Sequence, residues 1–219
     1  MRAVYLHGFA STPDGSKGRF FSERLAAHGV GLECPDLNAP DFATLTVTRM
    51  VTQVEAVIAN GPRDEVVVFG SSLGAFVAWI VAGRADAAGH PLSKLVLLAP
   101  AIDFGTDAWD DLGEGVVDAW RETGWHTVMH YGYGEPRRVH YELFADKGQY
   151  DASRIDVTTS TLVCMGRRDE IVRPAAVDAF FSPRAHARLQ WYDDGHQLLA
   201  HLDTMWRDIE NFLGPPSSR

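Results

Sequence analysis

One stretch, residues 65–79, constrains the fold of this 219-residue chain most strongly. It begins with a valine-rich apolar run typical of a buried strand, and from Leu73 onwards apolar residues recur at helical spacing. Between the two lies G-x-S-x-G, with Gly70, Ser72 and Gly74 at its fixed places. A strand that turns this sharply into a helix holds its serine in strained backbone with the hydroxyl exposed, and it needs glycine where the two elements almost touch. The stretch therefore predicts a nucleophile elbow at Ser72.

The rest of the chain repeats this alternation of apolar strand and amphipathic helix. Five further strands are expected, at residues 3–6, 31–35, 95–100, 161–165 and 188–192. Four further helices are expected, at residues 20–26, 45–58, 174–181 and 198–212. Strands that alternate with helices in this way form a doubly wound sheet with right-handed crossovers. We therefore expect an α/β fold with a mainly parallel sheet of about six strands flanked by helices.

Residues 103–150 interrupt this pattern. They contain no clean buried strand and are instead rich in aromatic residues, histidines and acidic residues. A helix is expected near 110–123, and a hairpin is expected between 127–131 and 138–142 across a glycine-rich turn. A long aromatic insertion between two core strands is typical of a cap over a site. We expect one domain over 1–219 with a cap at 103–150, and a purely structural decoration is the alternative.

Composition and charge exclude several classes of protein. The net charge of −9 argues against nucleic acid and anionic membrane surfaces as partners. No apolar run is long enough to span a bilayer, and the N-terminus enters a strand without a secretory signal pattern. Two cysteines without metal-ligand spacing suit a reducing compartment. We expect a cytoplasmic protein that binds neither nucleic acid nor membrane, and the sequence leaves its oligomeric state open.

Candidate reactive residues directly follow the predicted strands. The carboxyl ends of parallel strands meet at one edge of the sheet, where ligands of such folds bind. A serine nucleophile needs a base, and the base needs a third group to orient it. The chain supplies Ser72, Asp169 and His196 in this order. We expect Ser72 to be the nucleophile, His196 the general base and Asp169 the orienting acid.

Other interpretations of these residues remain open in the sequence. Asp103 follows the preceding strand, and Asp193 and Asp194 stand beside His196, so each competes as the orienting acid. Asp169 also suits a structural role, because an acid before a helix faces the positive end of its dipole. His196 also suits an ordinary loop position between a strand and a helix.

Four segments together resemble a known family. They are Y-L-H-G-F at 5–9, G-S-S-L-G at 70–74, G-R-x-D-E-x-V at 166–172 and G-H at 195–196. On these motifs the chain resembles small bacterial α/β-hydrolases of the esterase type over nearly its whole length, and the order serine, acid, histidine is typical of that superfamily. The resemblance implies the α/β-hydrolase fold. It also implies an oxyanion hole made by the backbone N–H groups of Phe9 and Leu73.

The expected function is that of a serine hydrolase. Its substrate would be a small-molecule carboxylic ester or a thioester, cleaved through an acyl-enzyme intermediate. We expect substrate contacts from His7, Ser11, Trp109 and Trp125, and we also weigh His7 as a residue that pins its loop. Peptidase, lactonase or acyltransferase activity would need only a different cap and pocket, because a fold does not determine its chemistry.

Three further interpretations are weaker. A catalytically silent member of this fold, used for binding or regulation, would have damaged reactive residues, but all three are in place. A nucleotide-binding fold needs G-x-G-x-x-G after the first strand, and the chain lacks it. His126, His130 and His140 invite a metal interpretation, but residues 127–129 favour a strand and no other ligand has a telling spacing. We expect neither a cofactor nor a metal.

Overall fold

A single parallel sheet forms the centre of the molecule. The computed structural model describes residues 1–61, 65–107, 109 and 112–214. Its sheet has six strands in the order β2-β1-β3-β4-β7-β8, and every neighbouring pair is parallel. The strands are β1 (Arg2–Leu6), β2 (Leu32–Glu33), β3 (Val66–Ser71), β4 (Lys94–Leu98), β7 (Thr161–Gly166) and β8 (Ala187–Tyr192). The predicted α/β sheet of about six strands is confirmed.

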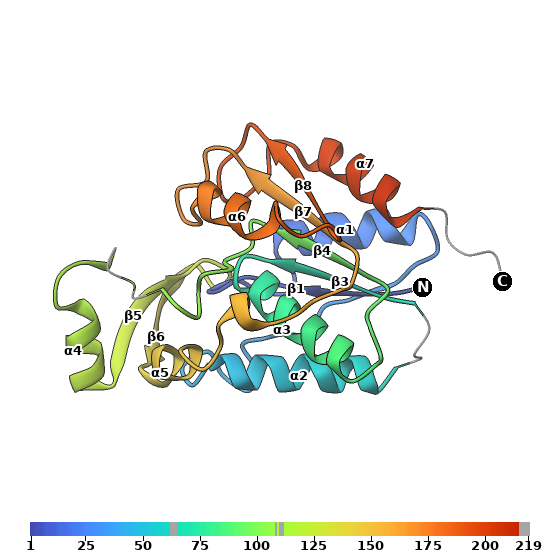
Figure 1. Ribbon diagram of the computed structural model, residues 1–219. Helices are drawn as coiled ribbons and strands as arrows, with labels where there is room; N and C mark the ends of the chain where they lie inside the picture. The colour runs from blue at the N-terminus through green and yellow to red at the C-terminus, as the bar shows by residue number, and fades with distance from the viewer. Residues whose placement is uncertain (62–64, 108, 110–111, 215–219) are drawn as a thin grey trace.

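Helices cover both faces of this sheet (Figure 1). They are α1 (Ser16–Ala26), α2 (Val47–Ala59), α3 (Leu73–Ala87), α6 (Pro174–Phe181) and α7 (Leu202–Leu213). On one face, Phe21 of α1 contacts both Phe69 of β3 and Trp206 of α7. On the other face, Trp79 of α3 packs edge-on against Phe181 of α6. Aromatic side chains therefore contribute to the packing within each helical layer, and on the first face also to the packing against the sheet.

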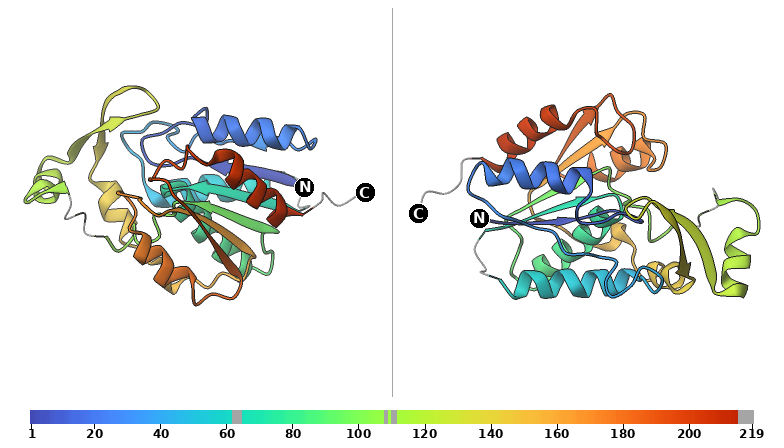
Figure 2. Two further views of the ribbon diagram at one scale, coloured as in Figure 1. Left: turned by 90° about the horizontal axis from the view of Figure 1, so that it is seen from above. Right: turned by 180° about the vertical axis from the view of Figure 1, so that it is seen from behind.

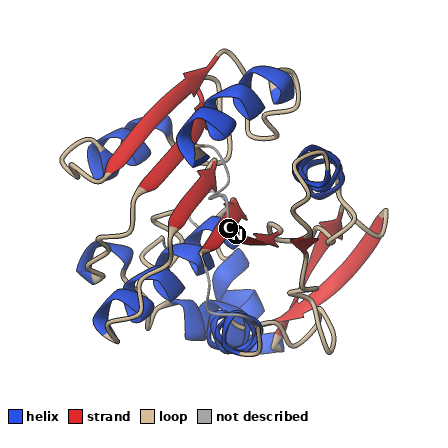
Figure 3. Ribbon diagram, turned by 90° about the vertical axis from the view of Figure 1, so that its right-hand side faces the viewer, coloured by secondary structure: helices blue, strands red, loops and turns tan. Residues whose placement is uncertain are grey.

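The middle of the sheet explains why the central segments lack amphipathic patterns. Every residue of β3 and of β7 is buried, as expected for parallel strands that are covered on both faces. Helix α3 is buried along most of its length, because it packs against β1, β3 and β4 and against α2. Figure 3 shows helices on both faces of the sheet. None of the described helices combines the length and the hydropathy that crossing a membrane would require.

Part of the 103–150 segment forms a hairpin and two short helices. Strands β5 (Trp125–His130) and β6 (Glu135–His140) are antiparallel, and helices α4 (Val116–Thr123) and α5 (Glu142–Lys147) precede and follow them. Figure 2 shows α4 and the hairpin extending beyond the end of the main sheet. The predicted hairpin is confirmed, with slightly shifted ends. Of the predicted helix at 110–123, residues 110 and 111 lie outside the described residues, and the helix that is described begins at Val116.

The last helix begins later than predicted. The apolar periodicity suggested a start at Leu198, but α7 begins at Leu202. Leu198 has a positive φ of 54°, and the N–H of Ala200 donates to the Asp194 carboxylate at 2.9 Å instead of entering a helix. Leu198 is nevertheless buried, so it matches the helical pattern by burial and not by backbone conformation.

Candidate active site

Ser72 occupies the sharp turn between β3 and α3. Its φ of 53° is rare for a residue other than glycine and is maintained only where the surroundings impose it. The Ser72 N–H donates to the carbonyl oxygen of Leu98 at 2.9 Å. Its own carbonyl oxygen accepts bonds from the N–H groups of Ala75, Phe76 and Ala101. The strained residue is thus held by the neighbouring strand and by the first turn of its own helix.

Two glycines allow this turn to pack tightly. A Cβ atom on Gly74 would collide with the carbonyl oxygen of Leu6 and lie 2.5 Å from that of His7. A Cβ atom on Gly70 would lie 2.6 Å from the Cα atom of Ala75. The start of α3 therefore touches the carboxyl end of β1, and this contact places Ser72 beside the loop that follows β1.

Substituting Gly74 tests this packing. We expect Gly74→Ala to lower the free energy of unfolding by about 3 kcal/mol, because backbone atoms of β1 and α3 must separate to admit the methyl group. Urea denaturation measures the loss. Gly31→Ala is the matched control, since a Cβ atom there would have nothing within 4 Å. Equal stability of the two variants would show that α3 does not depend on this close approach.

Ser72, His196 and Asp169 form a hydrogen-bonded chain, which we call the Ser–His–Asp chain. His196 Nε2 lies 3.1 Å from Ser72 Oγ, and His196 Nδ1 lies 2.9 Å from one Asp169 oxygen and 3.0 Å from the other. The Asp169 side chain is fully buried and also accepts from the N–H groups of Ile171 and Val172. A carboxylate only accepts bonds, so Nδ1 carries the proton and Nε2 is left to accept from the serine hydroxyl.

The three competing acids have other partners. Asp103 pairs with Arg173 at 2.8 Å, and Asp193 pairs with Arg168 at 3.3 Å. Asp194 accepts from two backbone N–H groups of its own loop. The acid that contacts the imidazole is therefore the one that follows β7.

The backbone N–H groups of Phe9 and Leu73 lie on the two segments that meet at Ser72. A Cβ atom on Gly8 would lie 3.3 Å from Ser72 Cβ, so the loop after β1 runs directly against the serine. Leu73 is the first residue of α3, where N–H groups have no partner inside the helix. Within the described part of the chain, neither N–H has a hydrogen-bond acceptor. Both N–H groups therefore keep a free hydrogen-bond donor within the described structure.

His7 pins the loop after β1. Its Nδ1 lies 2.9 Å from the carbonyl oxygen of Gly8, and its Nε2 accepts from the N–H of Leu37 at 3.0 Å. Burial lowers the pKa of His7, which keeps the ring neutral and fits one donating and one accepting nitrogen. The residue is only 2% exposed and both ring nitrogens have partners, which favours the pinning role over the predicted substrate contact.

Ser11 lies where the β5–β6 hairpin meets the loop after β1. The N–H of Gly132, in the turn of the hairpin, donates to the carbonyl oxygen of Ala10 at 3.2 Å, and a Cβ atom on Gly132 would contact Thr12. The tip of the hairpin thus rests on the loop that contains Phe9. Ser11 is partly exposed, and its contact with substrate stays a prediction.

Among the described residues, the ring partners of Trp109 and Trp125 do not include His196, the imidazole of the Ser–His–Asp chain. Trp125 packs on His140, its partner on the opposite strand of the hairpin. It stands five residues before His130, the last residue of β5, which places it roughly 16 Å along the strand from the tip of the hairpin. Trp109 stacks on Trp120 and packs edge-on against Phe104. The periodicity of this segment was too poor to show that Trp109 packs on Trp120 and that Trp125 packs on His140.

The predicted strand around residues 127–129 is confirmed as part of β5. Among the described residues, no three His, Cys, Asp or Glu side chains gather in positions to hold a metal ion. The buried ring of His130 stacks on Tyr133 and contacts Phe42 edge-on. Aromatic packing therefore accounts for this histidine.

Two residues at this edge of the sheet carried no sequence signal. Phe42 contacts Phe9 on one side and His130 on the other, which links the loop after β1 to the hairpin. Lys17 donates from Nζ to the carbonyl oxygen of Gln197 at 2.8 Å. Contacts of this kind follow from the path of the chain in space and not from a local pattern.

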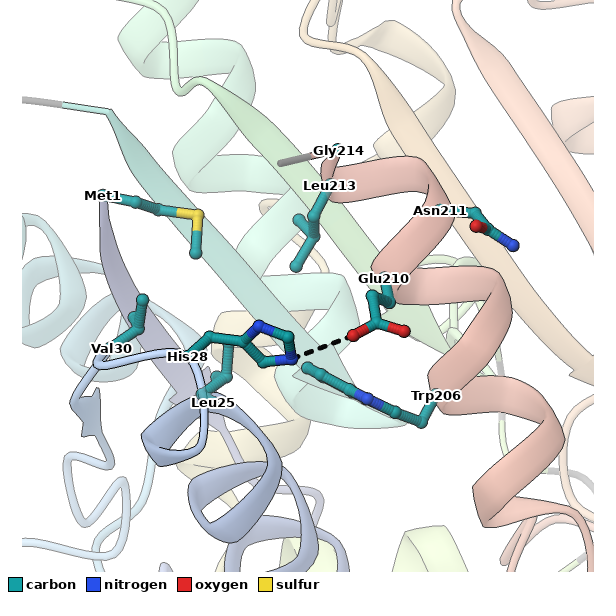
Figure 4. Close-up of a pocket in the computed structure, with 9 residues that line it drawn as sticks. All are labelled: Met1, Leu25, His28, Val30, Trp206, Glu210, Asn211, Leu213 and Gly214. Carbon is teal, nitrogen blue, oxygen red and sulfur yellow. Dashed lines mark ion pairs between the residues drawn. The ribbon is translucent and has the colours of Figure 1, made fainter. Parts of the chain in front are cut away.

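A hollow of about 400 Å³ lies at the other end of the molecule (Figure 4). Met1 and Gly214 line it, and both stand where the two ends of the described chain meet, away from the carboxyl ends of the strands (Figure 1). His28 and Glu210 form an ion pair across it at 2.9 Å. It contains no member of the Ser–His–Asp chain and is separate from the candidate site.

Sequence comparison assigns the family. A model of the family described as Uncharacterised protein family (UPF0227) matches residues 2–213. The chain belongs to this family. No protein with a curated description matches the sequence significantly.

Solved structures identify the fold of this UPF0227 member. A protein of Agrobacterium vitis S4 superposes with a TM-score of 0.84 at 22% identity, over 97% of this chain and 88% of that one. The mouse alpha/beta hydrolase domain-containing protein 10 gives 0.77 at 18% identity, over 96% and 88%. The monoacylglycerol lipase of Paleococcus ferrophilus gives 0.74 at 15% identity, over 96% and 93%. The fold is that of the α/β-hydrolases, as the resemblance implied.

Proposed function

We propose that this protein is a serine hydrolase that cleaves carboxylic esters of small molecules through an acyl-enzyme intermediate. The observation that carries the proposal is the Ser–His–Asp chain, with 3.1 Å between Ser72 and His196 and 2.9 Å between His196 and Asp169. A binding module of the same fold would have no need to keep a serine in strained backbone opposite a correctly oriented imidazole.

The proposed reaction gives each group a step. His196 Nε2 takes the proton of Ser72 Oγ as that oxygen attacks the ester carbonyl, and the N–H groups of Phe9 and Leu73 stabilise the negative charge that forms on the carbonyl oxygen. The imidazolium then gives its proton to the departing alcohol, which leaves the acyl group on Ser72. A water molecule, activated by the same imidazole, attacks this ester and releases the acid. The buried Asp169 carboxylate stabilises the imidazolium in both halves of the reaction.

Apolar side chains around the candidate site support an apolar acyl or aryl group in the substrate. Ile171, two residues after Asp169, is 67% exposed, and Leu199, three residues after His196, is 43% exposed. Tyr131, next to the hairpin turn that rests on the loop after β1, is 80% exposed. Large exposed apolar side chains on segments that carry or contact the proposed site suit an apolar ligand. We propose that residues 103–150 cap this ligand.

A series of p-nitrophenyl esters from acetate to decanoate tests the function, with release of p-nitrophenolate as the measurement. We expect kcat/KM to rise roughly fourfold per methylene until the acyl site is full, because each buried methylene contributes about 0.8 kcal/mol. Leu199→Ser should lower the rate for octanoate more than the rate for acetate, so acetate is the internal control. A parallel series of thioesters tells an esterase from a thioesterase. Failure to cleave any member of either series would refute the proposal.

We also propose a cytoplasmic location. The two cysteines, Cys34 and Cys164, are both free in the structure. Free thiols suit a reducing compartment. Fractionation of cells that produce the protein, followed by immunodetection, would test the assignment.

A further inference from the structure

Lys17 connects the first turn of α1 with the segment that contains His196. Its Nζ donates to the carbonyl oxygen of Gln197 at 2.8 Å, although the two residues are 180 positions apart. Gln197 directly follows His196, so this bond restrains the backbone one residue from the imidazole. Lysine loses much side-chain freedom when it is ordered, and an ordered lysine at such a place therefore calls for an explanation.

The ring of His196 bonds Asp169 and Ser72, and the rest of the segment between β8 and α7, residues 193–201, is held by bonds near its start and within itself. The N–H of Arg168 donates to the carbonyl oxygen of Asp194 at 3.0 Å, which attaches the start of the segment to the loop after β7. The Asp194 carboxylate accepts from the N–H groups of Gly195 and Ala200, which close the segment on itself. The bond from Lys17 is the one that attaches it to α1, just after the imidazole.

Burial and nearby charges also shift the pKa of Lys17. The Asp169 carboxylate faces it from the loop after β7, and the Asp194 carboxylate faces it from the 193–201 segment, which also contains the titratable rings of His196 and His201. Burial lowers the pKa of Lys17 to about 8, although the two carboxylates raise it. The ammonium is therefore charged at neutral pH and loses its charge a little above it.

We propose that Lys17 is a positioning residue, which holds the His196 imidazole in line with Ser72 by anchoring the carbonyl group of Gln197 from α1. This inference rests on the proposed function. A charge-assisted N–H···O bond is stronger than a neutral one, so the anchor is firmest while Lys17 is protonated. A small displacement of the imidazole is costly, because proton transfer from the serine requires hydrogen-bond distance.

Three variants separate positioning from general structural effects. We expect Lys17→Met to lower kcat about 10-fold or more with KM changed less than about threefold, because the lost bond moves the base and not the substrate site. Lys17→Arg should keep kcat within about threefold, since a guanidinium supplies the same donor and charge. Arg19→Met is the matched control, because it removes one positive charge from the exposed face of the same helix. Its kcat should equal that of the wild type.

The pH profile gives a readout that a merely structural role would not change. At pH 6 the kcat of the wild type should exceed that of Lys17→Met by the full 10-fold or more, and this ratio of the two kcat values should narrow as the pH rises through the pKa of Lys17 at about 8. The Lys17→Arg variant should show no such narrowing, since arginine stays charged over this range. A ratio that stays constant from pH 6 to pH 10 would contradict the anchoring role of the ammonium.

Hydrogen–deuterium exchange separates the failure of this inference from failure of the proposed function. The amides of Leu198 and Ala200 are bonded within the 193–201 segment, and we expect them to exchange several-fold faster in Lys17→Met than in Arg19→Met. This measurement needs no substrate. If the wild type cleaves no ester, unchanged exchange in Lys17→Met still overturns the anchor. If the wild type is active, equal kcat for Lys17→Met and Arg19→Met overturns the positioning role, whatever the exchange shows.

Discussion

Ser72→Ala should lower kcat for the hydrolysis of p-nitrophenyl esters by about 10⁵- to 10⁶-fold, the range expected when the nucleophile of a serine hydrolase is removed. Alanine lacks the oxygen that attacks the carbonyl carbon, so no acyl-enzyme can form. The backbone would change little, because the bonds that hold this turn all use main-chain groups. Steady-state release of p-nitrophenolate measures the loss, and mass spectrometry of the acylated protein locates the intermediate.

The control for this variant is Ser182→Ala at the end of α6. The Ser182 hydroxyl bonds the side chain of Asp178 and lies outside the proposed site, so this variant should keep the wild-type rate. If Ser72→Ala retained the activity, another group would be the nucleophile and the assignment of Ser72 would be wrong. An acyl group found on a residue other than Ser72 would lead to the same conclusion.

Asp169→Asn should lower kcat by about 10³- to 10⁴-fold while the protein stays folded, as expected when the imidazole is held in the wrong tautomer. Asp169 Oδ1 accepts from the N–H groups of Ile171 and Val172, so an asparagine would keep its oxygen at that position. Its NH₂ group would then replace Oδ2, which lies 2.9 Å from His196 Nδ1. A donor at that place favours the tautomer in which Nδ1 accepts and Nε2 carries the proton. The imidazole then cannot accept the proton of Ser72.

Two measurements complete this prediction. Asp193→Asn is the matched control, because Asp193 is exposed and pairs with Arg168 instead of the imidazole. It should change kcat less than about twofold, since an exposed ion pair contributes little. The ¹⁵N chemical shifts of the His196 ring nitrogens report the tautomer directly. An Asp169→Asn variant with the wild-type rate and the wild-type tautomer would show that another group orients the base.

Local patterns predicted the elements that depend on neighbours in the sequence. The valine-rich run, the glycines at 70 and 74 and the apolar repeat after them specify a strand, a tight turn and a helix, because each depends on residues a few positions apart. Pro174 likewise predicted the first residue of α6. The start of α7 was predicted too early because the Asp194 carboxylate holds the backbone of the preceding loop, and an apolar repeat does not reveal that bond.

In the candidate site too, some features depend on neighbours in the sequence and others on residues far apart in it. The sequence predicted the candidate residue types and their places after the strands, because the strands are parallel and their carboxyl ends share one edge. It left four acids open as partners of His196, and the packing of the chain brings Asp169 into contact with the imidazole. Only the tertiary structure placed Lys17 beside Gln197. The physical reason is that these contacts join residues 27 and 180 positions apart, whose approach depends on how the whole sheet and its helices pack.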